Sequence, residues 1–304
     1  MSGISTNRSD ITLPSEVSQE ILAKLQTESA VMRLARGVTL PGRGLTIPVI
    51  SGDPEAAWVA ETDEKPVSNP SLSTKLMEAY MLSVIVPFSN QFRRDARALY
   101  DELVRRLPAA LALQFDKTVV GAVAKPGANF DNFAACTSQS LIATNSPAHT
   151  VYDGLVAAFG DIADGGYALD GFALSPTAQG ILLGAVDKND RPLFINSAAD
   201  GAVPVILGAR TVMGRGVYKA GTAAAGSSSG SPAIIGIAGD WTQALYGTVE
   251  GVQISISDQA TLTSGTTQIN LWQRNMFAVR AEIEVGFRAD TSAFNLLTGA
   301  VPEA

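Results

Sequence analysis

Alternating apolar and polar positions in residues 45–87 predict a long β-hairpin. Its outgoing strand includes residues 46–50, whose internal proline favours an edge position. Residues 61–70 are charged and contain prolines, which is typical of a solvent-exposed tip. The return strand is expected to run unbroken from Ser71 to about Val86. One of its faces collects the apolar residues Leu72, Leu76, Tyr80, Leu82, Val84 and Val86.

Helical spacing predicts the main helix from about Tyr100 to Val123. Pro108 lies inside this segment and should kink the helix or split it in two. Gly121 marks its end. The apolar stripe expected to face the core consists of Leu103, Leu107, Leu111, Phe115 and Val119. The polar residues expected to lie off that stripe are Asp101, Glu102, Arg105, Arg106, Asp116 and Lys117.

Shorter elements precede and follow the main helix. Residues 17–25 have helical spacing, and Pro41–Gly44 predicts a turn. Residues 145–260 have the pattern of a separate compact unit. Its predicted elements are helices Val151–Ala163 and Pro176–Leu183 and strands Phe172–Ser175, Ala233–Ala238 and Val252–Ile256. Gln268–Arg288 is expected to form one long strand, which ends in strict alternation of Ala281, Ile283, Val285 and Phe287 with Glu282, Glu284 and Gly286.

The predicted hairpin is too long to be stabilised by its own domain. An isolated two-stranded ribbon is only marginally stable in water. The chain is also rich in apolar residues, at 46%, with a mean hydropathy of +0.17. Such a chain must hide apolar surface, and extensive contact between subunits is one way to do so. We therefore expect the hairpin to lie on a neighbouring subunit.

Composition also limits the location and the partners of the chain. No apolar stretch of about 18 residues occurs, so a membrane span is not expected. Residues Met1–Asp10 lack an apolar signal core, which favours folding in a cytoplasm. The net charge is −7, so the basic footprint of a nucleic-acid-binding protein is absent. An acidic wall could nevertheless enclose DNA without adsorbing it.

The residues that carry catalytic or metal chemistry are few. Cys136 and His149 are the single cysteine and the single histidine, which excludes a thiolate zinc cluster and a multi-histidine site within one chain. Residues 226–230 match the G-x-S-x-G pattern, with Ser228 as the nucleophile, but lie in a Gly/Ser-rich run that favours a flexible loop. Gly214–Gly216 lacks the third glycine of a dinucleotide loop. We expect no enzyme activity, cofactor or metal.

The order of these elements resembles the major capsid proteins of tailed bacteriophages with the Hong Kong 97-type fold, an α+β architecture. The resemblance covers nearly the whole chain, and the order and spacing of the elements carry it. The segments that contribute most are Trp58–Pro66, Phe172–Phe194, Gly239–Trp241 and Asn270–Phe287, followed by Asp290, Phe294 and Leu297.

The resemblance implies a division of the chain. It implies an N-terminal arm (1–40), an extended hairpin loop (41–87), a peripheral domain with the long spine helix (88–144 with 262–304) and an axial domain (145–261). It further implies a structural subunit that forms hexamers and pentamers of an icosahedral shell in the virion, enclosing double-stranded DNA and assembled in the bacterial cytoplasm. The candidate residues for contact between subunits are Trp58, Glu61, Lys65, Arg93, Arg94 and Arg97.

Other aspects of the family stay open at this point. The arm begins almost at Met1, so a separate scaffolding protein and a portal are the expected partners. Some relatives join a loop lysine to an asparagine of a neighbour, and Lys65, Lys75 and Asn295 supply such residues, although ordinary solvated residues are favoured. An encapsulin-like compartment with protein cargo is the alternative shell, which the long arm disfavours. A hydrolase that uses Ser228 is the third hypothesis.

Overall fold

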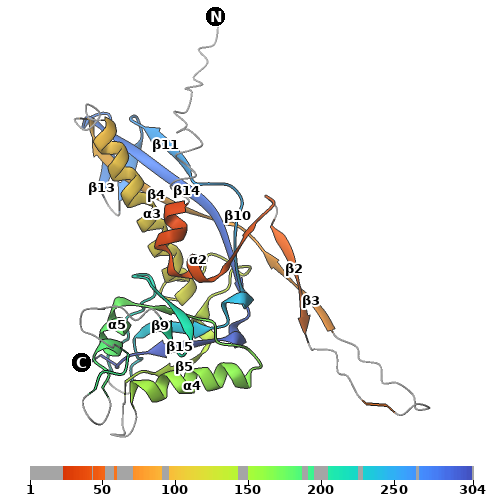
Figure 1. Ribbon diagram of the computed structural model, residues 1–304. Helices are drawn as coiled ribbons and strands as arrows, with labels where there is room; N and C mark the ends of the chain where they lie inside the picture. Colours follow the sequence, from red (N-terminus) through yellow and green to blue (C-terminus); the bar gives the residue numbers. More distant parts are fainter. Residues whose placement is uncertain are drawn as a thin grey trace, which may run out of the picture.

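The chain is an elongated α+β body from which one β-hairpin projects (Figure 1). The computed structural model describes residues 23–42, 44–51, 58–59, 71–90, 96–142, 150–186, 191–194, 205–224, 229–264 and 267–302. Side chains are also outside the description at residues 48–51, 71–73, 96–105, 264 and 267. His149 and Ser228 lie outside the described residues.

The first of two large sheets is built around one long strand. Strand β4 pairs along one edge of β14, while β11 and β10 pair in turn along the other, and β1 extends β10 in parallel. The members are β1 (Arg36–Thr39), β4 (Tyr80–Ser89), β10 (Ala244–Thr248), β11 (Gln253–Ser257) and β14 (Met276–Ala289). The arm thus contributes a strand to this sheet, which the sequence analysis did not predict.

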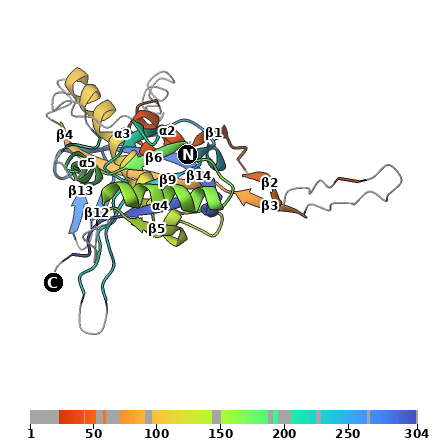
Figure 2. The same ribbon diagram turned by 60° about the horizontal axis from the view of Figure 1, so that its bottom comes forward.

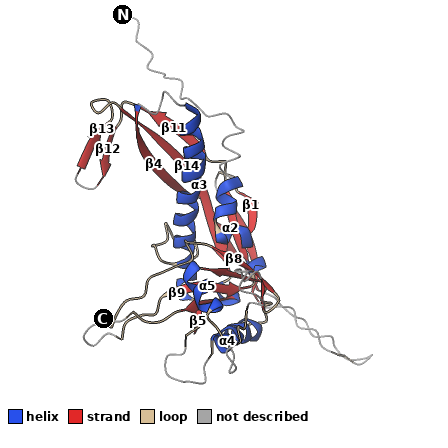
Figure 3. Cartoon of the chain, turned by 60° about the vertical axis from the view of Figure 1, so that its left-hand side comes forward, coloured by secondary structure: helices blue, strands red, loops and turns tan. Residues whose placement is uncertain are grey.

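One face of this sheet is covered by helices α2 (Ala30–Leu34) and α3 (Ala96–Val120), as Figure 3 shows. Predicted alternation is confirmed in β14, where Ala281, Ile283 and Phe287 are buried in the shared core. Strand β4 alternates in the same way, with its even-numbered residues inward. Its odd-numbered residues from Met81 to Pro87 are exposed, so the sheet is covered on one side only along this strand.

The second sheet has the strand order β5-β15-β9-β6-β8-β7. Its strands are β5 (Thr137–Ser140), β6 (Gly171–Leu174), β7 (Val205–Ile206), β8 (Ala209–Met213), β9 (Ile234–Gly239) and β15 (Phe294–Thr298). Helix α4 (Val151–Asp164) packs against β5, β15 and β9, and α5 (Pro176–Leu183) against β6 and β9 (Figure 2). These helices begin where the sequence predicted them, because Thr150 and Ser175 cap their first turns.

The two sheets exchange segments of the chain. Strands β10 and β11 come from residues 145–261 but pair in the first sheet, whereas β5 and β15 come from outside that range and pair in the second. The sheets therefore do not divide at the boundaries expected from the sequence. Hydrophobic alternation identifies a strand but does not show which partner its backbone hydrogen bonds will select.

The chain crosses between the sheets three times, once by way of α3 and twice through short turns that are bonded to each other. Short 3-10 turns η3 (Trp241–Gln243) and η4 (Thr291–Ala293) make the two bonded crossings, each capped by an aspartate. The N–H of Asp240 donates to the carbonyl of Ala293 at 3.0 Å, and the N–H of Asp290 donates to the carbonyl of Gln243 at 3.2 Å. Between the sheets, Trp241 is buried against Phe133 and Phe294.

Two long strands expected from the sequence are each divided by a break. The return strand is interrupted at Glu78–Ala79, so that β3 (Ser71–Met77) pairs with β2 (Leu45–Ser51) while β4 pairs with β14. The expected strand Gln268–Arg288 is interrupted by a turn at residues 271–275. Asn275 has a left-handed φ of 53° there, a conformation that asparagine tolerates. The interruption leaves β13 (Thr267–Asn270) paired with β12 (Thr261–Ser264).

The main helix is continuous through Pro108, so of the two expected outcomes, a kink or a split, the structure excludes the split. It begins at Ala96 and ends at Val120, where Gly121 has a φ of +83° that favours glycine. A proline removes one helical hydrogen bond at a cost of about 3 kcal/mol. Leu107 and Leu111 flank it and are buried, and burying each contributes about 2 kcal/mol. Core packing therefore holds the helix together across the proline.

We expect Gly154→Ala to lower the free energy of unfolding by about 2 kcal/mol. A Cβ atom at this position would lie 2.2 Å from the backbone oxygen of Ser140, so α4 would have to move away from β5. Gly160 in the same helix has no heavy atom within 4 Å of such a Cβ and provides the control. Gly160→Ala should raise the same free energy by about 0.5 kcal/mol. Urea titrations would measure the free energy of unfolding of both variants. Equal changes in the two variants would show that the contact with Ser140 does not matter.

Candidate assembly surfaces

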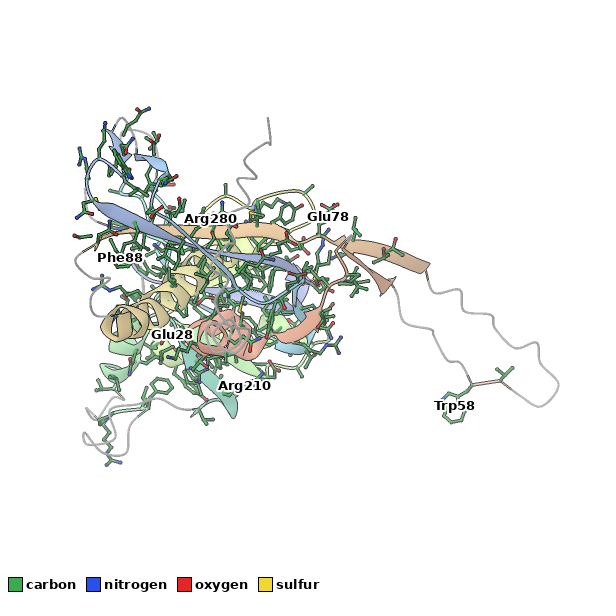
Figure 4. The ribbon with its side chains drawn as sticks, turned by 90° about the horizontal axis from the view of Figure 1, so that it is seen from above. Glu28, Trp58, Glu78, Phe88, Arg210 and Arg280 are labelled. Carbon is green, nitrogen blue, oxygen red and sulfur yellow. The ribbon has the colours of Figure 1, made fainter. Side chains whose placement is uncertain are left out.

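The hairpin of β2 and β3 extends away from the body of the molecule. Each strand pairs only with the other among the described residues. Trp58, beyond the end of β2, has an exposed fraction of 105%, and Figure 4 shows its side chain far from the rest of the chain. A tryptophan this exposed stabilises nothing within its own subunit. It is suited to contact with another molecule.

Arg288 on β14 fixes the root of this hairpin. Its guanidinium donates to the backbone oxygen of Leu76 on β3 at 2.8 and 2.5 Å, and to the side-chain oxygen of Asn129 at 2.8 Å. It also forms a 2.8 Å ion pair with Asp131. Both side chains of this pair are largely shielded from solvent, which strengthens their interaction relative to a surface pair. We call Leu76, Asn129, Asp131 and Arg288 the hairpin root.

Close backbone contacts complete the root. Gly44, at the start of β2, has a φ of +84°, and a Cβ there would lie 2.5 Å from the oxygen of Met77. A Cβ on Gly286 of β14 would lie 2.5 Å from the oxygen of Glu78. Only glycine permits both approaches. The position at which the hairpin leaves the sheet is therefore set by backbone packing together with the Arg288 contacts.

A second polar cluster attaches the arm to the main helix. Asp116 of α3 is buried and accepts hydrogen bonds from the Ser29 hydroxyl at 2.5 Å and from the N–H of Ala30 at 2.9 Å. The Ser29 oxygen in turn caps α2 by accepting from the N–H of Met32. Asp116 lies off the apolar stripe of α3, as the sequence analysis expected, but it is buried. We call Ser29, Ala30 and Asp116 the arm anchor.

The short glycine motif considered for dinucleotide binding packs against the arm anchor. A Cβ on Gly214 would lie 2.6 Å from the Cβ of Ala30, and one on Gly216 would lie 2.4 Å from the Cβ of Asp116. These glycines therefore allow close contact between the segment after β8, the arm and the main helix. Their spacing is explained by packing.

Stability should depend on pH through the arm anchor. Burial raises the pKa of the Asp116 carboxyl to about 6, although the hydrogen bonds from Ser29, Ala30 and Val31 oppose this. Between about pH 4 and pH 6 the folded chain keeps a proton that the unfolded chain has lost. The contribution of this group to the free energy of unfolding therefore falls as pH rises through that window, by at most about 1.4 kcal/mol per pH unit.

Asp116→Asn removes this titration. The difference in free energy of unfolding between the original chain and the variant should decline from pH 4 to pH 6, as measured by urea unfolding at each pH. A difference that stays constant over this range would contradict the assigned role of the carboxyl.

The structure describes only some of the candidate contact residues. Trp58 is exposed. Arg97 lies in α3, with its side chain outside the described residues. Glu61, Lys65, Arg93 and Arg94 lie outside the described residues altogether. Contact between subunits through these residues remains a prediction.

The residues considered for crosslinking do not share one environment. Lys75 on β3 is exposed, but Asn295 on β15 is fully buried. The Asn295 amide donates to Asp161 at 2.6 Å and to Thr137 at 3.1 Å. Asn295 therefore stabilises the second sheet and is inaccessible to a neighbouring lysine.

The surroundings of the single cysteine disfavour its reactive thiolate form. Burial, reinforced by Asp290, raises the pKa of the Cys136 thiol to about 12, so the thiol stays protonated near neutral pH.

Among the residues that the structure describes, no three metal-ligating side chains gather in one place. In the same part of the chain, no helix combines the length and the apolar character needed to cross a membrane.

Comparison with known proteins shows the family to which this chain belongs. The model of the "Phage capsid family" matches residues 10–299. The probable major capsid protein of Mycobacterium phage L5 is 31% identical over 300 residues, covering 94% of this chain and 89% of the relative.

Solved structures have the same fold. A chain from Gordonia phage Cozz aligns with a TM-score of 0.69 at 20% identity, covering 90% of this chain and 87% of the other. A chain described as "Capsid of empty GTA particle computed with C5 symmetry" aligns with a TM-score of 0.62 at 14% identity, covering 99% and 95%.

Proposed function

The chain belongs to the phage capsid family and is a major capsid protein with the Hong Kong 97-type fold, and from this premise we propose that its copies close into pentamers and hexamers of an icosahedral head. Such rings arise when each copy makes the same heterologous contact with the next. The relative whose structure has C5 symmetry is consistent with five-membered rings.

The projecting hairpin is the observation that carries this proposal. It has two strands, an exposed tryptophan beyond β2 and a firmly held root, but no third strand among the described residues. A two-stranded ribbon gains stability when it lies on another surface. A neighbouring subunit supplies that surface in a closed shell, where the hairpin adds contact area beyond that of the compact body.

The two sheets correspond to two parts of the shell subunit in this proposal. The second sheet, with α4 and α5, forms the axial part near the ring axis. The first sheet, with α3, forms the peripheral part. Because the segments exchange between sheets, these parts are better defined by strand pairing than by the ranges 145–261 and 262–304.

The proposed head encloses double-stranded DNA without reading its sequence. A net charge of −7 suits a wall that does not adsorb the phosphates it contains. Assembly in the bacterial cytoplasm, a scaffolding protein and a portal remain predictions, as does the lack of catalysis. The encapsulin-like compartment and the hydrolase gain no support from the relatives found.

Electron microscopy of particles purified from phage-producing cells tests the proposal. We expect closed shells of uniform size, with fivefold and sixfold rings and DNA inside. Closed shells that hold protein cargo without DNA would favour the encapsulin-like alternative. Protein that stays monomeric under conditions where related capsids assemble would contradict the proposal.

A further inference from the structure

Helix α4 carries an apolar stripe on the side that faces away from its own sheet. Leu155, Ala158 and Ile162 on the inner side are fully buried. On the outer side, Tyr152, Val156 and Phe159 have exposed fractions of 46, 41 and 45% and follow the i, i+4, i+7 spacing of one helix face. The outer face of a surface helix is normally polar. We call these three residues the α4 stripe, and an exposed stripe of this kind marks an interaction surface.

A second exposed apolar site lies at the turn between β7 and β8. Leu207 and Gly208 form a two-residue turn, with φ values of 49° and 80°. This pattern is that of a type I′ turn, which strongly favours Asn-Gly because both central residues need a positive φ. The left-handed region is sterically unfavourable for leucine. Leu207, which has this strained backbone conformation, is 38% exposed, and the nearby Val205 is 56% exposed.

The fold itself does not require leucine at this turn. Asparagine would form the same turn with less strain and would leave a polar surface. Backbone strain that the chain retains at an exposed apolar residue indicates a role for that side chain in contact with another molecule. We call Val205 and Leu207 the β7 turn site.

The two apolar sites lie toward opposite edges of one sheet. Helix α4 covers the half that begins with β5, whereas β7 is the edge strand at the other end of the order. One copy therefore cannot bring its own α4 stripe to its own β7 turn site. Two copies related by rotation can do so, and repetition of that head-to-tail contact closes a ring.

Helix α4 and the segment that follows β7 carry charges of opposite sign. Helix α4 carries Asp153, Asp161 and Asp164 and no basic residue. Residues 205–224 carry Arg210, Arg215 and Lys219 and no acidic residue. Arg210 lies on β8, directly after the turn (Figure 4 labels its side chain). Charge complementarity of this kind fixes the register of two partners and disfavours other pairings.

We propose that the β7 turn site of one copy packs on the α4 stripe of the next copy around each ring axis. This inference rests on the proposed function, because it names the contact through which the axial parts meet. The occupant of the α4 stripe is thus a second copy of this chain, with Leu207 seated among Tyr152, Val156 and Phe159.

Leu207→Asn separates the contact from the fold. It should raise the melting temperature of dilute subunits by about 2 °C, because strain is relieved. It should also raise the concentration needed for assembly about tenfold, because the apolar contact is lost. Leu207→Met keeps an apolar side chain and should leave assembly unchanged. Unchanged assembly by Leu207→Asn would contradict the inference.

Crosslinking tests the partner directly. In a Cys136→Ser background, Phe159→Cys with Leu207→Cys should give covalent ladders of up to five or six subunits after oxidation of assembled shells. Trp272→Cys with Leu207→Cys is the control pair and should give no ladder, because Trp272 lies beyond β13 in a different part of the chain. Intact shells without a ladder would overturn this contact but leave the proposed function standing. The absence of shells from the original chain would instead overturn the proposed function.

Discussion

Replacing Arg288 by alanine is expected to lower the free energy of unfolding by about 3 kcal/mol and to prevent assembly of closed shells. The guanidinium links three segments that are distant in the sequence: β3, the loop that contains Asn129 and Asp131, and β14. Its loss leaves the Asp131 carboxylate without its cation in a largely shielded position, and leaves the Leu76 oxygen without that donor.

Arg288→Ala should impair the assembly of shells more than its loss of folding stability alone would explain. Without Arg288, the hairpin keeps its two strands but loses the contacts that fix its direction relative to β14. Each copy would then have to order its hairpin during assembly, which adds an entropic cost at every contact. Urea unfolding measures the first effect, and sedimentation of assembly mixtures measures the second.

Arg280 provides a matched control on the same strand. Its Nε lies 3.2 Å from Glu282, but its side chain is half exposed. Exposed ion pairs contribute little, so Arg280→Ala should change the free energy of unfolding by about 0.5 kcal/mol or less. Equal losses in the two variants would show that the environment at the hairpin root does not matter.

Replacing Asp116 by alanine should release the arm from the main helix. The Ser29 hydroxyl and the N–H of Ala30 would be left buried without their acceptor, and each such group costs about 1–3 kcal/mol. Removal of a buried carboxyl relieves some desolvation, so the expected net loss of stability is about 2 kcal/mol. Because α2 and β1 follow the anchor directly, residues 23–40 should become sensitive to limited proteolysis.

Gln114→Ala is the appropriate comparison for this variant. Gln114 lies two residues away on the same helix and is exposed, so its replacement should leave both stability and proteolysis nearly unchanged. If the Asp116→Ala chain resisted proteases as well as the Gln114→Ala chain does, the arm would not depend on the anchor.

Periodicity predicted most of the elements correctly. The four described members of the main-helix stripe, Leu107, Leu111, Phe115 and Val119, are all buried. Helices α4 and α5 have the predicted positions because serine or threonine caps, proline and glycine mark their ends. Local signals of this kind act over one or two turns of chain, so they can be recognised without the tertiary structure.

The long-range contacts could not be predicted in the same way. Arg288 follows the apolar Phe287 at the end of an alternating strand, a pattern that by itself favours an outward, exposed face for Arg288. It is shielded because β3 and the loop with Asn129 and Asp131 pack against it from distant parts of the sequence, and nothing in the local pattern indicates this. Asp116 was more accessible to prediction: it is spaced four residues from both Ala112 and Val120, which form a second buried row on α3.

The bonded pair of crossings between the sheets limits how this subunit can change shape. A hinge usually needs a connection that can rotate freely, and here each crossing donates a backbone hydrogen bond to the other while Trp241 fills the space between them. We therefore expect both sheets to move as one piece whenever the subunit changes shape. Bending of the subunit would then fall on the base of the projecting ribbon, where strand pairing is interrupted at Glu78–Ala79.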